Sequence, residues 1–244
     1  MPDQLAFTRL LNHLFGPIVA SLMNMVGVHP ANPAAPINDT FALELLVAGG
    51  LVLFFVIVRA TLSVEKPNPA QQIAEMIHEF TGSNAEQIIG HGYERFQAFV
   101  TCIFLFVVIN NLLGLIPGIA TPTKSPVVPL GIALCTFIYY HFYGFKEQGP
   151  VGYMKHFAGP IWWIAPLLFP IEIVSHFARI MSLTIRLYAN MFASDLVTLV
   201  FFSLVPVGIP VIFLGLHAGV SLIQAYVFML LAMIYLSQAV AHEH

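Results

Sequence analysis

Charged residues are scarce in this sequence. Only 9% of its 244 residues are Asp, Glu, Lys or Arg, whereas 58% are hydrophobic. A soluble domain carries about 25% charged residues, so a normal water-facing surface is excluded and a lipid bilayer is implied. We predict an all-α polytopic membrane protein, with about 20 residues in each span. The formal net charge of −3 gives no reason to expect a nucleic-acid partner.

Cysteine is nearly absent. Cys102 and Cys135 both lie inside apolar runs, and they predict neither a disulfide framework nor a metal site. We expect them to be small buried side chains. A glycine-rich phosphate loop is also missing, because the 17 glycines are scattered along the chain. Nothing in the sequence therefore predicts a nucleotide site, a metal or another cofactor.

Basic residues are rare before the first apolar run. Arg9 is the only one ahead of residues 14–28, Asp3 offsets it, and no small-residue cleavage pattern follows. A cleaved signal peptide is therefore the less favoured alternative. Apolar residues recur at helical spacing in this segment. We expect residues 1–40 to form an amphipathic helix and a loop at the membrane surface.

Four further segments can be assigned from apolar runs and turn residues. Residues 41–60 predict the first transmembrane helix. Residues 61–95 alternate acidic residues with isoleucines after two prolines, which indicates an interfacial helix on the cytoplasmic side. Residues 96–143 predict two transmembrane helices joined by a proline-rich turn, and residues 144–165 a cytoplasmic connection.

The last third of the chain contains unusually long apolar runs. No proline or glycine occurs from Ile171 to Val205, a stretch of 35 residues that spans about 52 Å as a helix. The hydrocarbon core is only about 30 Å thick, and ordinary tilts cannot absorb the excess. We therefore predict that residues 166–244 form a long, strongly tilted helical hairpin that starts near Pro170 and turns near Pro206. This gives about five membrane-embedded helices in total.

Basic residues in the connections set the orientation. The more basic side of a membrane protein faces the cytoplasm, and the count here is five against two. We expect an integral protein of a bacterial inner membrane, with its N-terminus outside and its C-terminus in the cytoplasm. The cytoplasmic set is Arg59, Lys66, Arg95, Lys146 and Lys155, and the outer set is Arg9 and Lys124.

Polar residues interrupt both long helices. Charged groups deep in apolar helices are costly and usually mark ion paths. Five polar or charged residues of the first helix are separated by 4, 3, 7 and 4 residues along the chain. This spacing places them on one stripe of the helix surface. Asp195 lies nine residues after Arg186, which places it on the opposite face. The stripe consists of Glu172, His176, Arg179, Arg186 and Asn190.

The second long helix adds His217, Gln224 and Gln238, which are spaced by multiples of seven and are expected on one stripe. In a hairpin, His217 and Asp195 lie at comparable depth near the turn, on the outer side. Structural explanations stay open for several of these residues. His217 can be a hydrogen-bonded interior histidine, and Asn190 and Gln224 can bridge the two helices.

The first helix allows a structural alternative as well. Glu172 can pair with His176 or Arg179 and simply tie tilted helices together. Arg186 is different, because no carboxylate lies within one turn of it on its own helix. An unpaired arginine inside a membrane is hard to explain structurally, so Arg186 is the strongest functional candidate.

Several motifs resemble one family. The sequence Ser182-Leu-Thr-Ile-Arg-Leu-Tyr-Ala-Asn-Met191 resembles the Arg-Leu-x-x-Asn-Met signature of subunit a of F-type ATP synthases. Leu115-Ile-Pro-Gly118, followed by Thr121-Pro-Thr123, is similar to the segment after that family's Asn-rich span. Gln224-Ala-Tyr-Val-Phe228 and Tyr235-Leu-Ser237 resemble its last helix. The resemblance covers most of the chain from about residue 40 onward.

The resemblance implies a non-catalytic stator subunit with two aqueous half-channels. These deliver protons to the carboxylates of a ring of c subunits and release them again. It implies that Arg186 faces the ring and prevents a short circuit, with Asn190 and Gln224 beside it. Asp195 and His217 then belong to the outer path, and Glu172, with His176, to the cytoplasmic path. The implied partners are the c ring, the b subunits of the peripheral stalk and membrane lipid. The acidic face of residues 65–94 is the expected contact for the stalk.

Two other classes of protein compete with this hypothesis. A secondary ion transporter would show inverted repeats and interrupted helices around a midplane site, but the sequence has one hairpin and no duplication. A purely structural membrane subunit of a respiratory complex would not need an arginine without a partner.

Overall fold

The fold was analysed in a computed structural model that describes residues 5–25, 27, 32, 35–116, 119, 121–158, 165–204 and 208–240. For residues 150–158, 165 and 209 only the backbone is described. Over these residues the secondary structure is helical throughout, which confirms the predicted all-α class. The α-helices are α1 (Ala6–Met25), α2 (Asp39–Ala60), α3 (Pro69–Ile89), α4 (Glu94–Leu112), α5 (Val127–Ala158), α6 (Ala165–Leu204) and α7 (Ile209–Val240), with short 3-10 helices η1 (Leu113–Leu115) and η2 (Pro122–Lys124).

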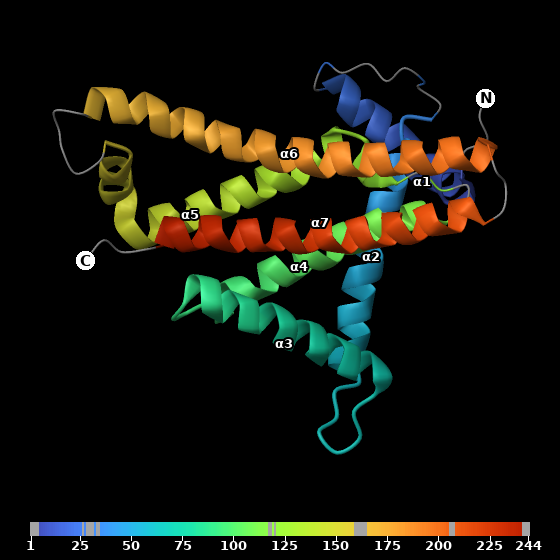
Figure 1. Cartoon of the computed structure of the whole chain (residues 1–244), viewed down its shortest axis with the longest axis horizontal. Helices are drawn as coiled ribbons and strands as arrows, with labels where there is room; N and C mark the ends of the chain where they lie inside the picture. The colour runs from blue at the N-terminus through green and yellow to red at the C-terminus, as the bar shows by residue number, and fades with distance from the viewer. Residues whose placement is uncertain are drawn as a thin grey trace.

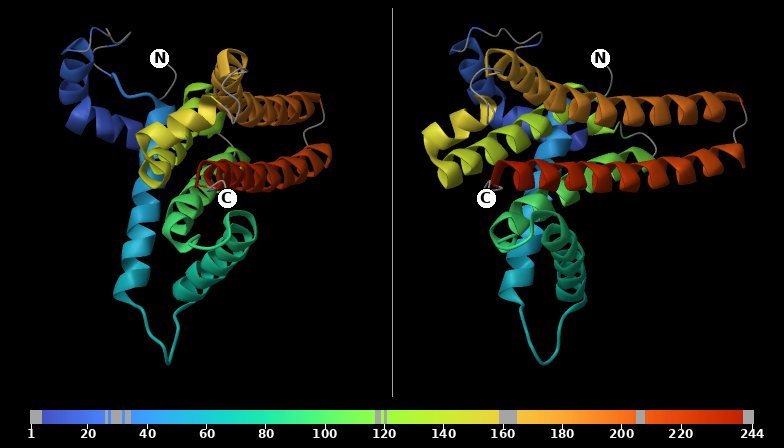
Figure 2. Two further views of the ribbon diagram at one scale, coloured as in Figure 1. Left: turned by 90° about the vertical axis from the view of Figure 1, so that its left-hand side faces the viewer. Right: turned by 60° about the vertical axis from the view of Figure 1, so that its left-hand side comes forward.

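Five helices, α2 and α4 to α7, are long and apolar enough to cross a membrane. The predicted hairpin is confirmed as well, because α6 and α7 run side by side in opposite directions along the long axis of the molecule (Figure 1). With 40 residues, α6 is about 60 Å long. Helix α2 runs across the direction of the hairpin in both figures (Figure 2). The hairpin and α2 therefore cannot both stand upright in a bilayer.

Helix α6 begins earlier than predicted. It starts at Ala165, and Pro170 stands inside it rather than at its first turn. Proline removes one backbone hydrogen bond and crowds the preceding turn. The helix continues through it, so the expected boundary at Pro170 was wrong by five residues. The predicted turn residue Pro206 lies outside the described residues.

Helix α5 is also longer than expected. The connection expected from residue 144 onward is helical as far as Ala158, with one non-helical residue at Gly149. Gly149 has φ 70° and ψ 160°, a conformation that glycine adopts without the steric penalty of a Cβ atom. The chain bends there, and the last part of α5 turns away from the rest of the helix (Figure 1).

Two apolar clusters hold the helices together. The first lies among α4, α5, α6 and α7 and includes Leu183, Leu187, Met191 and Phe228. The second joins α3 to α4, α5 and α7 through residues such as Phe96. Helix α2 contributes to neither cluster and exposes much of its apolar surface. A long apolar helix with so few protein contacts is stable where lipid covers it.

Polar contacts fix the interfacial helix α3 to its neighbour. The hydroxyls of Thr81 and Thr101 lie 2.8 Å apart, and the Gln97 side chain donates to the carbonyl of His78 at 2.7 Å. The opposite side of α3 is acidic and exposed, with Glu75, Glu79 and Glu86 turned away from the other helices.

Helix α1 turns its small and polar residues inward. Thr8, Asn12 and Gly16 are buried at helical spacing. The Asn12 amide donates to the carbonyl of Ile37 at 2.9 Å and accepts from the Ile37 N–H at 2.9 Å. Its apolar side chains point outward, which suits contact with lipid. These exposed residues are Leu10, Leu14, Phe15, Ile18 and Leu22.

The two cysteines do not follow the expectation of burial. Cys102 and Cys135 are both exposed on the outside of the helical assembly. The expectation used the burial preference of soluble proteins. In a membrane protein the exposed face of a span meets hydrocarbon, where a small apolar thiol fits as well as in the core.

Asn12 offers a test of how α1 is attached. Asn12→Ala removes both hydrogen bonds to Ile37 and leaves two backbone groups unpaired, at a cost of about 1–3 kcal/mol for each group that stays dry. We expect faster proteolysis of the segment before α2 in membrane vesicles. The neighbouring exposed His13 supplies the control, because His13→Ala removes no such contact. Equal protease resistance of the two variants would show that Asn12 does not anchor α1.

Candidate ion-path site

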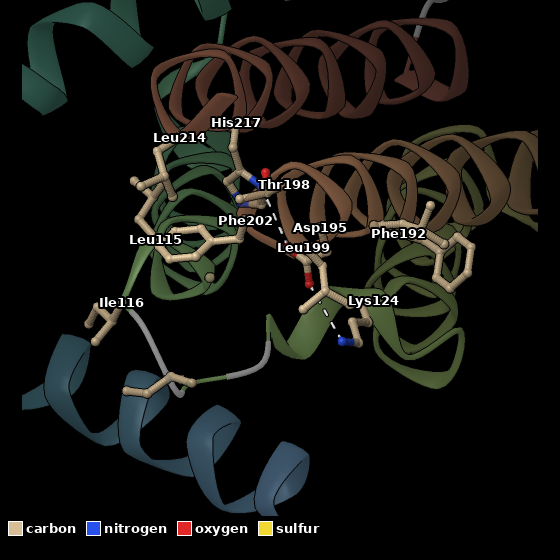
Figure 3. A pocket seen from close by; sticks show the side chains of 13 residues that line it. Leu115, Ile116, Lys124, Phe192, Asp195, Thr198, Leu199, Phe202, Leu214 and His217 are labelled. Carbon is tan, nitrogen blue, oxygen red and sulfur yellow. Dashed lines mark ion pairs between the residues drawn. The ribbon is translucent and has the colours of Figure 1, made fainter. Parts of the chain in front are cut away.

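A cavity of about 450 Å³ opens near the turn end of the hairpin. We call it the Asp195 cavity. Its walls come from α6, α7, η1 and η2, and most of them are apolar (Figure 3). Charged or titratable groups enter it from three elements, and these are Asp195, His217 and Lys124.

Asp195 has partners on both sides of its carboxylate. Its Oδ1 accepts a hydrogen bond from the Thr121 hydroxyl at 3.0 Å and lies 3.5 Å from Nδ1 of His217. Its Oδ2 lies 3.7 Å from Nζ of Lys124 (Figure 3). The aspartate is therefore long enough to reach His217. Because Thr121 and Lys124 belong to the connection between α4 and α5, they were missed by reasoning from the two long helices alone.

His217 is 1% exposed and links the Asp195 cavity to the interior. Its Nε2 donates to the carbonyl of Asn111 at 3.3 Å, and its Nδ1 lies 2.9 Å from the Ser194 hydroxyl. Nδ1 therefore faces both Ser194 and Asp195. A neutral His217 accepts at this nitrogen from the serine, and a protonated one can donate to the aspartate.

The polar groups continue along α7 beyond His217. Ser221 and Gln224 follow at helical spacing and are buried. The amide of Asn111 donates to the carbonyl of Ser221 at 3.4 Å and accepts from the Thr123 hydroxyl at 2.7 Å. Gln224 accepts from the Asn190 amide at 2.7 Å, which bridges α7 to α6. The sequence indicated Asn190 and Gln224, but it did not connect Asn111 to them.

Gln238 does not belong to this buried stripe. It is exposed, whereas His217 and Gln224 are buried, so the expected stripe of three was wrong. A straight α-helix drifts by about 20° for every seven residues. Over the 21 residues from His217 to Gln238 the drift is enough to move the last side chain off the packed face.

A second cavity of about 260 Å³ lies between α6 and α7. Asn190, Ser194 and Thr198 line it from α6, and Phe213, Leu216 and Val220 line it from α7. Thr198 also lines the Asp195 cavity. Thr198 is therefore common to the two linings, and the second cavity extends to Asn190, one turn from Arg186.

Arg186 occupies an exposed face of α6. The packed face of this helix carries Leu183, Leu187 and Met191, and Arg186 lies to one side of it. Its Nη2 donates to the Ser182 hydroxyl at 3.1 Å. In the part of the chain that the structure describes, Arg186 forms no ion pair. Exposed apolar side chains elsewhere on the hairpin include Ile185, Leu196, Leu199, Leu222 and Ile223.

A separate group of titratable residues lies near the start of α6. We call Glu172, His176, Tyr140 and His141 the Glu172 cluster. Nε2 of His176 lies 3.3 Å from the Glu172 carboxylate, and its Nδ1 lies 3.0 Å from the Tyr140 hydroxyl. The ring centroids of His141 and His176 are 4.8 Å apart. Tyr140 and His141 were missed because nothing in the α5 sequence shows which side faces α6.

Arg179 packs against helix α7. Its guanidinium lies over the ring of Tyr235 on α7, with its central carbon 5.0 Å from the ring centroid. Glu172 pairs instead with His176. Of the two structural ties considered for Glu172, the described residues show the one with the histidine.

Comparisons with known proteins decide the family. A family model described as "ATP synthase A chain" matches residues 42–237. The chain is 54% identical over 244 residues to ATP synthase subunit a of Koribacter versatilis, and the match covers all of both chains. The chain belongs to the subunit a family of F-type ATP synthases. Two further subunit a proteins match, from Solibacter usitatus (45% over 224 residues, 92% of this chain and 95% of that one) and Bdellovibrio bacteriovorus (42% over 172 residues, 70% and 75%).

Membership of the subunit a family confirms the resemblance found in the motifs. It makes the chain a multi-pass membrane subunit of the ATP synthase complex without catalytic activity of its own. It also extends the resemblance. The first 40 residues matched no motif of the family, but the Koribacter subunit a aligns with them as well.

Gly114 of this subunit a allows a test of the site's packing. A Cβ atom at residue 114 would overlap the Thr121 hydroxyl and lie 3.2 Å from Nε2 of His217. We expect Gly114→Ala to destabilise the protein by about 1–3 kcal/mol, a typical cost of overpacking. The measurement is the thermal unfolding midpoint of the purified complex. Gly131→Ala is the control, because a Cβ atom there meets nothing within 4 Å.

A second substitution should restore part of the stability that Gly114→Ala removes. Adding Thr121→Ala removes the hydroxyl that the new methyl group meets, so the double variant should recover part of the lost stability. If Gly114→Ala is as stable as Gly131→Ala, η1 and η2 are not packed as closely as described.

Proposed function

We propose that the chain provides two aqueous half-channels that carry protons to and from the carboxylates of a c ring. The observation that carries this proposal is the placement of Arg186. It is exposed on the hairpin, with Asp195 on one side of it along α6 and the Glu172–His176 pair on the other. Asp195 lies nine residues after it and Glu172 fourteen before it. These separations correspond to about 13 and 21 Å along the helix.

The outer half-channel is proposed at the Asp195 cavity. Asp195 and His217 face each other across it, and the second cavity leads on toward Asn190. Buried carboxylates and histidines in membrane helices commonly form proton relays. Asn190 and Gln224 hold α6 and α7 together at the point where this path reaches the exposed face.

The inner half-channel is proposed at the Glu172 cluster. Glu172 is partly exposed and pairs with His176, which is buried against α5. The cluster lies toward the end of the hairpin that is opposite the α6–α7 turn. The chain's C-terminal end lies at that end of the molecule, and α1 lies nearer the turn (Figure 1). Together with the distribution of basic residues, this supports a cytoplasmic position for Glu172 and an outer position for Asp195.

Arg186 acts as a fixed charge in this mechanism. Arginine stays protonated in proteins, so it cannot relay a proton. Its charge favours the ionised form of a ring carboxylate that passes it, and it repels protons that would cross directly between the half-channels. For net transport, the ring must then rotate along the longer arc between the two half-channels. About 2.3 kcal/mol for each charge and each 100 mV of membrane potential is available to drive this rotation.

Two protein partners follow from the surfaces. The c ring would cover the exposed apolar face of α6 and α7 and supply the carboxylate that Arg186 lacks in its own chain. The b subunits of the peripheral stalk would contact the acidic face of α3, which carries Glu75, Glu79 and Glu86. Lipid covers the remaining apolar surface, in a bacterial inner membrane with the N-terminus outside.

A secondary ion transporter is the competing function. Such proteins bind their ion at the midplane between interrupted helices. Over their described residues α6 and α7 are continuous, which favours the synthase subunit.

Arg186 tests the proposal most directly. We expect Arg186→Ala to abolish ATP synthesis driven by a proton gradient in membrane vesicles, because the fixed charge that separates the half-channels at the ring surface is then lost. Arg186→Lys should also lose most activity, since lysine can become neutral when desolvated and lacks the planar guanidinium. Arg59→Ala, at the exposed end of α2, is the control. Normal synthesis with alanine at residue 186 would refute the mechanism.

His217 tests the outer half-channel. We expect His217→Ala to slow ATP-driven acidification of vesicles by about 100-fold, the lower end of the range for loss of a positioned proton-transfer group. Assembly of the complex should persist and can be checked by the amount of c ring that co-purifies. Unchanged flux with normal assembly would remove His217 from the path.

A further inference from the structure

Tyr140 is a buried phenol in the Glu172 cluster, and the proposed function gives it no role of its own. It lies on α5, is 2% exposed, and places its hydroxyl 3.0 Å from Nδ1 of His176 on α6. The ring is held by aromatic neighbours, with Phe137 edge-on at 5.4 Å and Tyr235 at 6.0 Å between centroids. Its hydroxyl is therefore fixed in place against the histidine.

The contacts of His176 with Glu172 and Tyr140 favour one tautomer. A neutral imidazole has one N–H donor and one acceptor nitrogen. A carboxylate without a proton only accepts, so in a pair with such a Glu172 the hydrogen lies on Nε2, 3.3 Å away. Nδ1 is then the acceptor, and the Tyr140 hydroxyl, 3.0 Å away, donates to it.

We infer that Tyr140 is a positioning residue of the inner half-channel, which holds His176 in the tautomer and orientation that present Nε2–H to Glu172. A partner at one imidazole nitrogen commonly fixes what the other nitrogen does. This inference rests on the proposed function, because it assigns a role within the path that contains Glu172 and His176.

Other charged or titratable groups lie around His176. The ring of His141 lies edge-on to it, at 4.8 Å between centroids, and the Arg179 guanidinium lies over the ring of Tyr235, which packs on Tyr140. Neither contact supplies a hydroxyl donor to Nδ1. The specific contribution of Tyr140 is its O–H group, and Tyr140→Phe removes that group while keeping the ring.

The test uses the assembled synthase in membrane vesicles. We expect Tyr140→Phe to slow ATP-driven acidification by about 3- to 10-fold, the effect of losing one hydrogen bond. The dependence of the rate on the pH of the cytoplasmic side should also change, because His176 is no longer held in one tautomer. Tyr143→Phe is the matched control. It removes a hydroxyl from the same helix, but its ring packs on Phe96.

A double-mutant cycle separates positioning from simple packing. If Tyr140 acts through His176, adding Tyr140→Phe to His176→Ala should cause no further loss of flux. Independent losses that multiply would overturn the inference, and so would a Tyr140→Phe variant with the parent's rate and pH profile.

The cycle also distinguishes this inference from the proposed function. If His176→Ala and Glu172→Gln both slow flux while Tyr140→Phe does not, the inner half-channel stands and the role of Tyr140 is refuted. If His176→Ala itself leaves flux unchanged, His176 leaves the path and the inference fails with it.

Discussion

A guanidinium on the apolar face of a membrane helix needs a counter-charge or water. Arg186 finds neither an acidic partner nor a buried position among the described residues of its own chain. The hairpin leaves this guanidinium exposed and also exposes apolar side chains such as Ile185 and Leu196. Under the proposed function, a carboxylate on another chain that covers this surface is the partner for Arg186.

In the rest of the chain, polar groups pack between the helices and apolar groups face outward. Asn12 binds the backbone of Ile37, and Thr81 bonds to Thr101, so hydrogen bonds attach helices that hydrophobic burial cannot attach in lipid. The apolar residues of α1 and α2 face outward. The burial preferences of soluble proteins do not apply to side chains that face lipid. For this reason both cysteines are exposed, although the sequence predicted that they would be buried.

The sequence was sufficient for features that depend on one helix. Uninterrupted apolar length predicted the hairpin, and helical spacing placed Asp195 and Arg186 on different faces. The depth argument brought His217 to Asp195, and the two lie 3.5 Å apart. Partners from other elements could not be predicted in this way. Thr121, Lys124 and Tyr140 reach the site only through the packing of η2 and α5 on α6, and no periodicity within one segment encodes that packing.

The buried polar row of the hairpin ends at Asn190, one turn from Arg186, and under the proposed mechanism this end has a consequence. From the Asp195 cavity, His217, Ser221 and Gln224 form a buried polar row that reaches Asn190. Between Asn190 and His176 the packed face of α6 carries Leu187, Leu183 and Ile180, together with Thr184, whose hydroxyl is occupied by its own helix. A proton that arrives near Asn190 therefore meets an apolar barrier inside the protein and a fixed positive charge on its surface. Under the proposed mechanism, the only remaining carrier to the Glu172 cluster is a carboxylate that moves past the hairpin on another chain.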